Sequence, residues 1–353
     1  VKVAVLGAGA MGQSGIENLR SNPQVNCVVA YDVRTEPLRQ VGIRFGIEAT
    51  EDLERILCDR EIRLVFITAS NDAHFPLACR ALEAGKAVFC EKPMAIRLED
   101  AATMVARAEE HQAFLQIGFE CRYSKLYAKV RQWIDRGLLG GVINTHCSYI
   151  CSEFHGKGSW RNQLATGGGM FGEKLSHYVD LSRWWIGSPV RELISMCAPN
   201  VIPYFQVRDN YHTTFRFENG AVAHLTFMMA VAATFGGDPL QNPIDQQRGD
   251  GHELRYVIEG TRGAAETDVF GRHIKRWEFG DSPASMTSTW VEDLSWDASE
   301  DHAYFHNTTD QTADIVRRVA ADEGPFTVAR DSYETMKVCF AAERSADEGR
   351  LVS

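Results

Sequence analysis

The chain has 353 residues, of which 44% are hydrophobic and 24% charged, and its formal net charge is −10. This length suggests two domains with enough material for buried cores. The acidic balance argues against a general nucleic-acid-binding protein, which would need a basic patch. The longest apolar run, Ala221–Phe235, is broken by His224 and is too short to span a bilayer. Val1–Leu6 has the pattern of a buried strand rather than of a signal peptide, so we expect a cytoplasmic protein with no nucleic-acid or membrane partner.

Short apolar runs alternate with helical segments over the first third of the chain. The pattern predicts strands at Val1–Leu6, Asn26–Tyr31, Leu64–Thr68, Ala87–Cys90 and Phe114–Gly118, and helices at Met11–Ser21, Pro37–Phe45, Leu53–Cys58, Pro76–Ala84 and Leu98–His111. Such alternation indicates βαβ units, in which helices cover both faces of a parallel sheet. We therefore predict the α/β class, with a doubly wound Rossmann domain over residues 1–120.

The pattern changes after about Phe119. A helix at Tyr127–Arg136 precedes alternating segments at Ile143–Cys151, Arg191–Cys197, Tyr211–Phe217, Ala221–Phe227, Leu254–Gly260 and Ala264–Asp268, with a hairpin turn at Asn219-Gly220 and a polar loop at Gly236–Gly251. Helices return at Thr309–Ala321 and Ser332–Asp347, and these could pack back on the first domain. Residues 121–353 are thus predicted to form an α+β domain with a large, open, mostly antiparallel sheet. Because one face of such a sheet lacks a cover, we expect a homodimer or homotetramer.

The nine cysteines are scattered and include no C-x-x-C pair, which is typical of reduced thiols. Cys147, Cys151 and His155 recur at a spacing that would put them on one face of a strand, where they could line a metal. No fourth ligand stands at a recognisable spacing, and small thiols that face a sheet core explain the pattern better. We therefore predict no metal site.

A glycine-rich turn follows the first predicted strand and opens the first predicted helix. Gly7-Ala8-Gly9-Ala10-Met11-Gly12 matches G-x-G-x-x-G. In such a turn the first glycine permits a tight bend, the second leaves room for a pyrophosphate, and the third lets helix and strand pack closely. The helix N-terminus adds free N–H donors for the anion. The sequence therefore predicts a dinucleotide site formed by Gly7, Gly9, Ala10, Met11 and Gly12.

The second predicted strand ends in Tyr31-Asp32, about twenty residues after the third glycine of the turn. A carboxylate at this place can accept hydrogen bonds from the adenosine ribose hydroxyls and repels the extra phosphate of NADP. NAD is therefore the predicted cofactor, with Asp32 as a contact. Arg34 lies close enough to Asp32 to weaken this preference and is included in the predicted cofactor site.

Two further segments carry a specific resemblance. One is Cys90-Glu91-Lys92-Pro93, at a strand end, and the other runs from Gly167-Gly168-Gly169 to His177-Tyr178-Val179-Asp180. Together with the glycine turn they resemble the glucose–fructose oxidoreductase / inositol dehydrogenase family, Gfo/Idh/MocA. The resemblance covers nearly the whole chain and extends to Thr68–His74, Gly118–Tyr123, Trp160-Arg161 and Glu259–Gly263.

The resemblance implies a Rossmann domain followed by an α/β domain whose exposed sheet face forms dimers or tetramers. It also implies an NAD-dependent oxidoreductase that acts on a sugar-like or cyclitol-like substrate in the second domain. Further cofactor contacts are implied for Thr68, Ser70, Asn71, His74 and Glu91.

By the same resemblance Lys92 would lie between nicotinamide and substrate, before a peptide bond to Pro93 that is often cis. A lysine at the carboxyl end of a parallel strand also faces the crevice in which such folds bind ligands. An amine at that place can take part in proton transfer. A lone lysine would be interpreted as a surface residue, but Glu91 and Pro93 beside Lys92 favour a catalytic and substrate-binding role.

Glu173 and His177 are spaced i, i+4, which on a helix puts them on one face, one turn apart. A neutral imidazole can accept the proton of a substrate hydroxyl, and a carboxylate can orient it and stabilise the imidazolium. A structural helical pair is the alternative, and a metal pair lacks an evident third ligand. The family usually has Asp at position 173 and Gly at position 175, so Glu173 and Leu175 depart from its pattern. We predict His177 and Glu173 as catalytic and substrate-contacting, and expect Asp180 to tether structure.

Four more residues match pocket or cofactor-side positions of the family. Arginine and tryptophan suit polyol binding through fixed donors and an apolar ring face. Packing between domains is the alternative for each of them. We assign Arg122 and His155 to the substrate, and Trp160 and Arg161 to the cofactor.

These residues predict a dehydrogenase in which His177, assisted by Lys92, deprotonates a secondary hydroxyl while hydride passes to nicotinamide C4. One alternative is an NAD-dependent glycosidase or lyase in which oxidation is transient, so that no NADH accumulates. Another is a non-catalytic, NAD-sensing binding protein, which would have no need of both Lys92 and His177.

Overall fold

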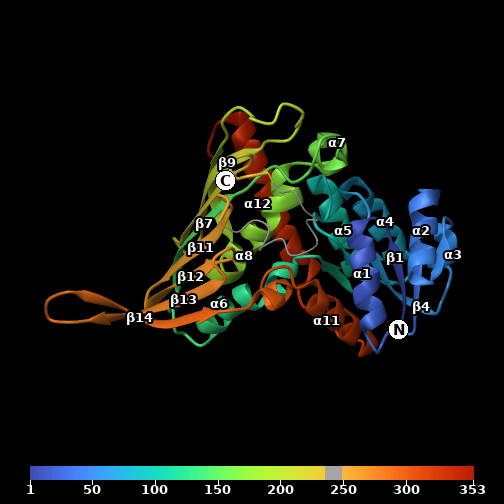
Figure 1. Cartoon of the computed structure of the whole chain (residues 1–353), viewed down its shortest axis with the longest axis horizontal. Coiled ribbons are helices and arrows are strands. Elements are labelled where there is room, and N and C mark those ends of the chain that lie inside the picture. The colour runs from blue at the N-terminus through green and yellow to red at the C-terminus, as the bar shows by residue number, and fades with distance from the viewer. Residues whose placement is uncertain (235–248) are drawn as a thin grey trace. The chain divides into compact units, whose positions relative to one another are not determined.

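The computed structural model describes residues 1–234 and 249–353, so most of the predicted loop Gly236–Gly251 lies outside the described residues. The chain divides into two compact units, each assembled from separate stretches (Figure 1). The first unit comprises Val1–Glu120, Leu164–Gly168 and Thr308–Lys337, and the second comprises Cys121–Gln163, Gly169–Asn307 and Val338–Ser353. None of the described helices has the length and apolar character needed to cross a membrane.

The first unit is built on a six-stranded parallel sheet in the order β3-β2-β1-β4-β5-β6. Its strands are β1 (Lys2–Leu6), β2 (Cys27–Tyr31), β3 (Glu48–Thr50), β4 (Ile62–Ile67), β5 (Ala87–Cys90) and β6 (Leu115–Ile117). Val3–Leu6 in β1 and Leu64 and Val65 in β4 are fully buried, as expected when helices cover both faces of a parallel sheet. This doubly wound sheet confirms the predicted Rossmann fold. The short edge strand β3 was not predicted, because Glu48-Ala49-Thr50 carries no apolar pattern.

The helices of the first unit come from both ends of the sequence. They are α1 (Ala10–Ser21), α2 (Thr35–Phe45), α3 (Leu53–Leu57), α4 (Asn71–Glu83), α5 (Leu98–Glu110), α7 (Leu164–Gly167), α11 (Thr308–Ala320) and the first part of α12 (Ala329–Glu348). Helix α11 packs beside α1 (Figure 1). Its Ile315 and Val316 belong to the same buried cluster as Val3 and Leu64. The C-terminal helical region therefore completes the core of the N-terminal sheet.

The second unit is built on an eight-stranded sheet in the order β14-β13-β12-β11-β7-β10-β9-β8. Its strands are β7 (Val142–Ile150), β8 (Val190–Met196), β9 (Asn210–Phe217), β10 (Val222–Met228), β11 (Glu253–Gly260), β12 (Gly263–Asp268), β13 (His273–Asp281) and β14 (Met286–Ser295). Among the described strands of this sheet only β7 and β10 pair in parallel, so the sheet is mostly antiparallel, as predicted. The hairpin of β13 and β14 was missed, because β14 is exposed along most of its length and lacks the period of a half-buried strand.

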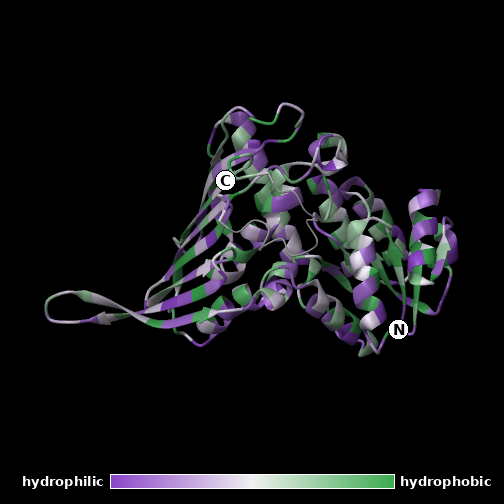
Figure 2. Cartoon of the chain, in the orientation of Figure 1, coloured by the Kyte–Doolittle hydropathy of each residue, from purple (hydrophilic) through white to green (hydrophobic). Residues whose placement is uncertain are grey.

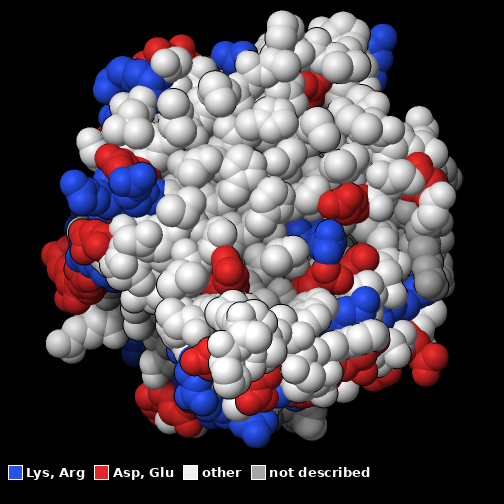
Figure 3. Space-filling view, turned by 90° about the vertical axis from the view of Figure 1, so that its left-hand side faces the viewer, with Lys and Arg blue, Asp and Glu red and all other residues white. Residues whose placement is uncertain are grey.

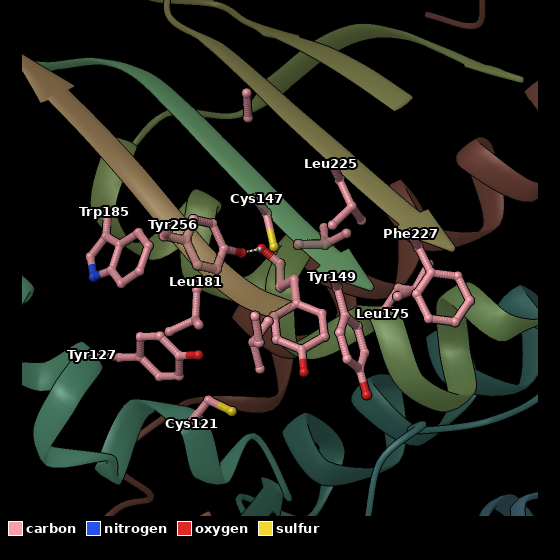
Figure 4. Close-up of a cluster of buried hydrophobic side chains, with 14 of the residues drawn as sticks. Cys121, Tyr127, Cys147, Tyr149, Leu175, Leu181, Trp185, Leu225, Phe227 and Tyr256 are labelled. Carbon is pink, nitrogen blue, oxygen red and sulfur yellow. Dashed lines mark hydrogen bonds between the residues drawn. The ribbon is translucent and has the colours of Figure 1, made fainter. Parts of the chain in front are cut away.

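Helices pack on one face of this sheet. They are α6 (Lys125–Asp135), α8 (Ser176–Ile186) and the last part of α12, with the short helical turns η1 (Glu120–Tyr123), η2 (Trp160–Asn162), η3 (Phe171–Leu175), η4 (Ala298–Glu300) and α10 (Asp301–Tyr304) elsewhere in the chain. Figure 4 shows Cys147, Leu225 and Tyr256 of the strands directed toward Leu181 and Tyr127 of the helices. The Tyr256 hydroxyl donates a hydrogen bond to the carbonyl of Tyr178 at 2.7 Å, which ties β11 to α8.

The other face of the sheet carries side chains of mixed polarity. Hydrophilic and hydrophobic residues alternate along its strands (Figure 2), so that inward residues such as Cys147 are buried while outward residues such as His146 are exposed. Lys, Arg, Asp and Glu are sparse over much of the side seen in Figure 3. His146 and His224 lie opposite each other on β7 and β10, with ring centroids 5.1 Å apart. This open, weakly charged surface is the one for which the sequence predicts a second subunit.

Candidate active site

The glycine turn between β1 and α1 has the geometry that a dinucleotide needs. Gly7 has φ +118°, and a Cβ atom there would lie 2.7 Å from the backbone of Thr68 and Ala69. A Cβ on Gly12 would lie 1.8 Å from the carbonyl oxygen of Gly7, so helix and strand approach closely there. A Cβ on Gly9, in contrast, would meet nothing within 4 Å. The backbone at each of the three positions therefore explains why the dinucleotide fingerprint has glycine there.

Helix α1 begins at Ala10 without a side-chain cap. The first N–H groups of a helix have no partner within it, and the positive end of the helix dipole favours an anion. The backbone N–H groups of Ala10 and Met11 are thus suited to a pyrophosphate beside the open space at Gly9. The residues present fit NAD.

Asp32 at the end of β2 is buried and already carries several hydrogen bonds. Its Oδ2 accepts from the Ala8 N–H at 2.8 Å and from Arg34 Nη2 at 2.9 Å, and its Oδ1 accepts from Arg34 Nε at 3.0 Å. Burial alone would raise the pKa of Asp32, but the bonds from Arg34 and Ala8 outweigh it and hold that pKa below its usual value. Asp32 is therefore ionised at neutral pH and forms an ion pair with the exposed guanidinium of Arg34.

The neighbouring strand ends hold polar residues that brace the backbone. Thr68 Oγ1, after β4, donates to the carbonyl oxygen of Gly7 at 3.0 Å. Asn71, the first residue of α4, donates through Nδ2 to the carbonyl oxygen of Gly167 at 2.8 Å. Ser70 precedes α4 and makes no side-chain cap there. The cofactor contacts expected of Thr68, Ser70 and Asn71 stay predictions, and two of these side chains have bracing bonds that the sequence did not suggest.

Lys92 follows β5, and its peptide bond to Pro93 is cis. The carbonyl oxygen of Pro93 lies 2.7 Å from Nδ1 of His74, whose Nε2 lies 3.2 Å from the carbonyl oxygen of Ala69. Burial lowers the pKa of His74 to about 4, so the ring is neutral at physiological pH and has one N–H to donate. We assign that proton to Nδ1 because its contact is the shorter one. His74 thus supports the turn that carries Lys92.

Glu91 lies beside a close approach between two strand ends. A Cβ on Gly118, just after β6, would lie 2.8 Å from Oε2 of Glu91. The Lys92 N–H donates to the same carboxylate oxygen at 3.3 Å. The glycine at position 118 therefore leaves room for the Glu91 side chain.

In the second unit Glu173 is buried between two basic side chains. Its Oε2 lies 3.2 Å from Nε2 of His155, and its Oε1 lies 3.0 Å from Nε of Arg161. The guanidinium of Arg161 also lies 4.7 Å from the ring centroid of Trp160. The structure thus brings together His155 and Glu173, which the sequence assigned to the substrate, and Arg161, which it assigned to the cofactor.

His177 is the second residue of α8 and is almost fully buried. The turn before it, Phe171–Leu175, is π-helical, so Glu173 lies in a wider turn than the regular α-helix for which the i, i+4 spacing places both side chains on one face. Single π-helical turns inside helices are frequent at functional sites. The carboxylate of Glu173 reaches His155 and Arg161, and its predicted support of the His177 imidazolium stays a prediction.

Arg122 and Asp180 form a buried ion pair. Nε and Nη2 of Arg122 each lie 2.7 Å from an oxygen of Asp180, and the guanidinium lies 5.5 Å from the ring centroid of Trp184. Such a two-pronged pair fixes α8 against the segment before α6. Asp180 therefore acts as the expected tether, and a contact of Arg122 with substrate stays a prediction.

Sequence reasoning missed Glu343 on α12. Its carboxylate accepts hydrogen bonds from the backbone N–H of Phe171 at 2.9 Å and from the hydroxyl of Tyr211. A signal was available in the sequence, because Met336, Cys339 and Glu343 share one face of the helix and the first two are buried. An acid on an apolar helix face indicates a specific partner.

A parallel doubly wound sheet with a dinucleotide turn, followed by an open antiparallel sheet, defines a two-unit nicotinamide-dependent oxidoreductase. Residues 1–119 match the family described as "Oxidoreductase family, NAD-binding Rossmann fold", and residues 127–266 match the "GFO/IDH/MocA C-terminal domain". The chain belongs to the GFO/IDH/MocA oxidoreductase family, as the sequence motifs predicted. Its N-terminal unit is therefore an NAD-binding Rossmann domain.

Named relatives are similar at low identity. Myo-inositol 2-dehydrogenase of Thermotoga maritima is 22% identical over the whole chain and 98% of its own length. Inositol 2-dehydrogenase of Salmonella typhimurium is 28% identical over 75% of the chain and 73% of its own length. A structure of levoglucosan dehydrogenase with NADH and levoglucosan has a TM-score of 0.80 at 20% identity and covers 100% of this chain and 98% of its own. The structural likeness shows the same fold, and the substrate is left to be proposed.

Proposed function

We propose that the protein is an NAD-dependent dehydrogenase that oxidises a secondary hydroxyl carbon of a sugar, glycoside or cyclitol. The observation that carries the proposal lies in the first unit. The anion-binding turn after β1 and Lys92 after β5 both stand at carboxyl ends of strands in one parallel sheet, with β4 between them. The carboxyl edge of such a sheet, near the point where the strand order reverses, is where these folds bind ligands.

The residues of the turn hold the cofactor in this proposal. Backbone N–H groups of Ala10 and Met11 receive the pyrophosphate, and Asp32 receives the adenosine ribose. NAD, when bound, supplies the hydride acceptor. The protein then has to bind the substrate, orient it and remove a proton from its hydroxyl group.

His177 and Lys92 are the proposed proton-handling groups. The buried imidazole of His177 accepts the proton of the substrate hydroxyl, and the ammonium of Lys92 donates a hydrogen bond to the oxygen as negative charge develops there. Glu173, with His155 and Arg161 on its two oxygens, forms a fixed set of polar groups suited to neighbouring hydroxyls. Relatives named as inositol dehydrogenases, and the levoglucosan dehydrogenase bound to NADH and levoglucosan, support a polyhydroxylated substrate.

A screen of sugars and cyclitols with NAD, read by the absorbance of the reduced cofactor, tests the proposal. Accumulation of NADH with at least one substrate is the expected result. Consumption of substrate without net NADH would instead indicate the redox-neutral glycosidase or lyase. Binding of NAD with no turnover of any compound would favour a sensor.

Two variants test the assignment of roles once a substrate is known. His177→Ala and Lys92→Ala should each lower kcat by roughly a hundredfold or more, because each removes a group that handles the proton. NAD affinity should hardly change, since the proposed pyrophosphate and ribose contacts involve other residues. Near-normal turnover of His177→Ala would contradict the proposed base.

A further inference from the structure

A carboxylate that the proposed chemistry does not use lies under the turn that leads to His177. Glu343 belongs to the part of α12 that packs in the second unit and is partly buried. Its Oε1 accepts the N–H of Phe171, the first residue of the π-helical turn, at 2.9 Å. An anion at the start of a helical turn satisfies a donor that has no partner within the helix. Glu343 thus caps the segment that carries Glu173.

The glycine run before the turn is shaped around this carboxylate. A Cβ on Gly169 would lie 2.2 Å from Oε1 and 2.5 Å from Cδ of Glu343, and its three nearest neighbours would all be atoms of that side chain. The N–H of Glu173 donates to the carbonyl oxygen of Gly169 at 3.0 Å. Glycine at position 169 therefore allows Glu343 to reach the same backbone stretch that orients Glu173.

Tyr211 holds the carboxylate from the other side. Its hydroxyl donates to Oε2 of Glu343, and its fully buried ring packs edge-on against Phe171 with centroids 4.7 Å apart. Tyr211 stands on β9, so one carboxylate joins a strand of the sheet, the end of α12 and the π-helical turn. Burial raises the pKa of Glu343, and the bonds from Tyr211 and Phe171 oppose that rise.

We propose that Glu343 is a positioning residue of the active site, which fixes the π-helical turn and thereby the side chains of Glu173 and His177. The inference rests on the proposed roles of those two residues. In this assignment Glu343 does not act on the substrate or the cofactor itself. It acts through the backbone of Gly169–Phe171. Single π-helical turns are less stable than α-helix and persist where surrounding contacts hold them.

A double-mutant cycle tests the proposal. Glu343→Ala should lower kcat about tenfold or more and leave the Kd for NAD unchanged. Glu343→Gln should keep kcat within about threefold, because the amide oxygen can still accept the Phe171 N–H. Gly169→Ala should be harmful in the wild-type chain but nearly neutral when combined with Glu343→Ala, since the three atoms nearest to the added Cβ all belong to the Glu343 side chain.

Ser345→Ala is the matched control. Ser345 lies on the same helix and is buried, and its Oγ accepts the Ser195 N–H at 2.9 Å and donates to the carbonyl oxygen of Arg350 at 2.6 Å, so its hydrogen bonds within the described part of the chain go to segments other than the π-helical turn. Its loss should lower Tm without lowering kcat. An equal loss of kcat in Ser345→Ala at matched stability would show that Glu343 acts only on overall stability, which would overturn the proposal.

Hydrogen exchange gives a readout that does not depend on turnover. Amides of residues 171–177 should exchange faster in Glu343→Ala than in Ser345→Ala, measured by mass spectrometry of the full chain. This measurement needs no dehydrogenase substrate. It therefore distinguishes failure of the positioning role of Glu343 from failure of the proposed dehydrogenase function. Unchanged exchange in that segment, or additive effects of Gly169→Ala and Glu343→Ala, would contradict the positioning role.

Discussion

The Nδ1 atom of His74 lies 2.7 Å from the carbonyl oxygen of Pro93, so that a neutral imidazole on α4 supports the turn after Lys92. Burial lowers the pKa of His74 to about 4, against an ordinary value of 6.5. Between about pH 4 and pH 6.5, His74 is therefore protonated in the unfolded chain but neutral in the folded protein. This difference makes the free energy of unfolding depend on pH.

As the pH falls from about 6.5 to about 4, the unfolded chain protonates at position 74 and the folded chain does not. The stabilising contribution of neutral His74 is thus complete above pH 6.5 and is lost progressively as the pH falls to 4. The two pKa values correspond to about 3 kcal/mol at about 1.4 kcal/mol per unit. His74→Gln should lose this part of the pH dependence in urea unfolding. Val88→Ala, in buried β5, should lower stability at every pH without changing the slope.

The pair of Asp32 and Arg34 predicts the cofactor preference. NAD should bind more tightly than NADP, because the ionised Asp32 repels a ribose phosphate. Asp32→Asn should shift the ratio of the two dissociation constants toward NADP by about tenfold, whereas Arg34→Ala should shift it toward NAD. Calorimetric titration of both nucleotides measures this, with Glu99→Gln, an exposed acid on α5, as the control. Tighter binding of NADP by the wild-type protein would show that Arg34 dominates.

The length of the Glu173 side chain predicts how replacement by aspartate affects kcat. Glu173 reaches His155 with one oxygen and Arg161 with the other. Glu173→Asp shortens the reach by one methylene and should lose one of these partners, so kcat should fall about tenfold even though Asp is usual in the family. Glu173→Gln keeps the shape and should cost less than His177→Ala. Steady-state kinetics on an identified substrate give both values, and full activity of Glu173→Asp would show that the length does not matter.

The open face of the second sheet predicts self-association. Val257 on β11 is 38% exposed on this face and lies opposite His146 of β7. We expect a dimer or tetramer at micromolar concentration by light scattering, and Val257→Lys should weaken the association at least tenfold because an unpaired charge would be buried. Ile43→Lys, at an exposed apolar residue of α2, is the control. A monomeric wild-type protein would contradict the prediction.

The fold was predictable because its signals are local. Buried strands such as Val3–Leu6 and the alternation in β7 and β10 follow directly from side-chain period. The hairpin of β13 and β14 could not be found in this way, since residues such as Met286 and Trp290 are exposed and give β14 no buried face to mark its period.

Residue types of the site were also predictable, but their partners were not. Motif spacing pointed to Glu173 and His177, yet no sequence rule places His155 and Arg161 on the two oxygens of Glu173. Glu343 lies far along the chain from Phe171, and only the packing of α12 brings them together. The π-helical turn has no sequence signature of its own, so regular helix was the natural expectation there.

The interleaving of the two units along the chain restricts how such a protein can be recombined. A fragment ending at Glu120 would carry every strand of the first sheet but would lack Ile315 and Val316, leaving part of its core open to water. A functional transplant of that unit has to bring Leu164–Gly168 and Thr308–Lys337 with it. The last boundary between the two units falls between Lys337 and Val338, inside the continuous helix α12. A chimaera must therefore keep the helical register across that junction.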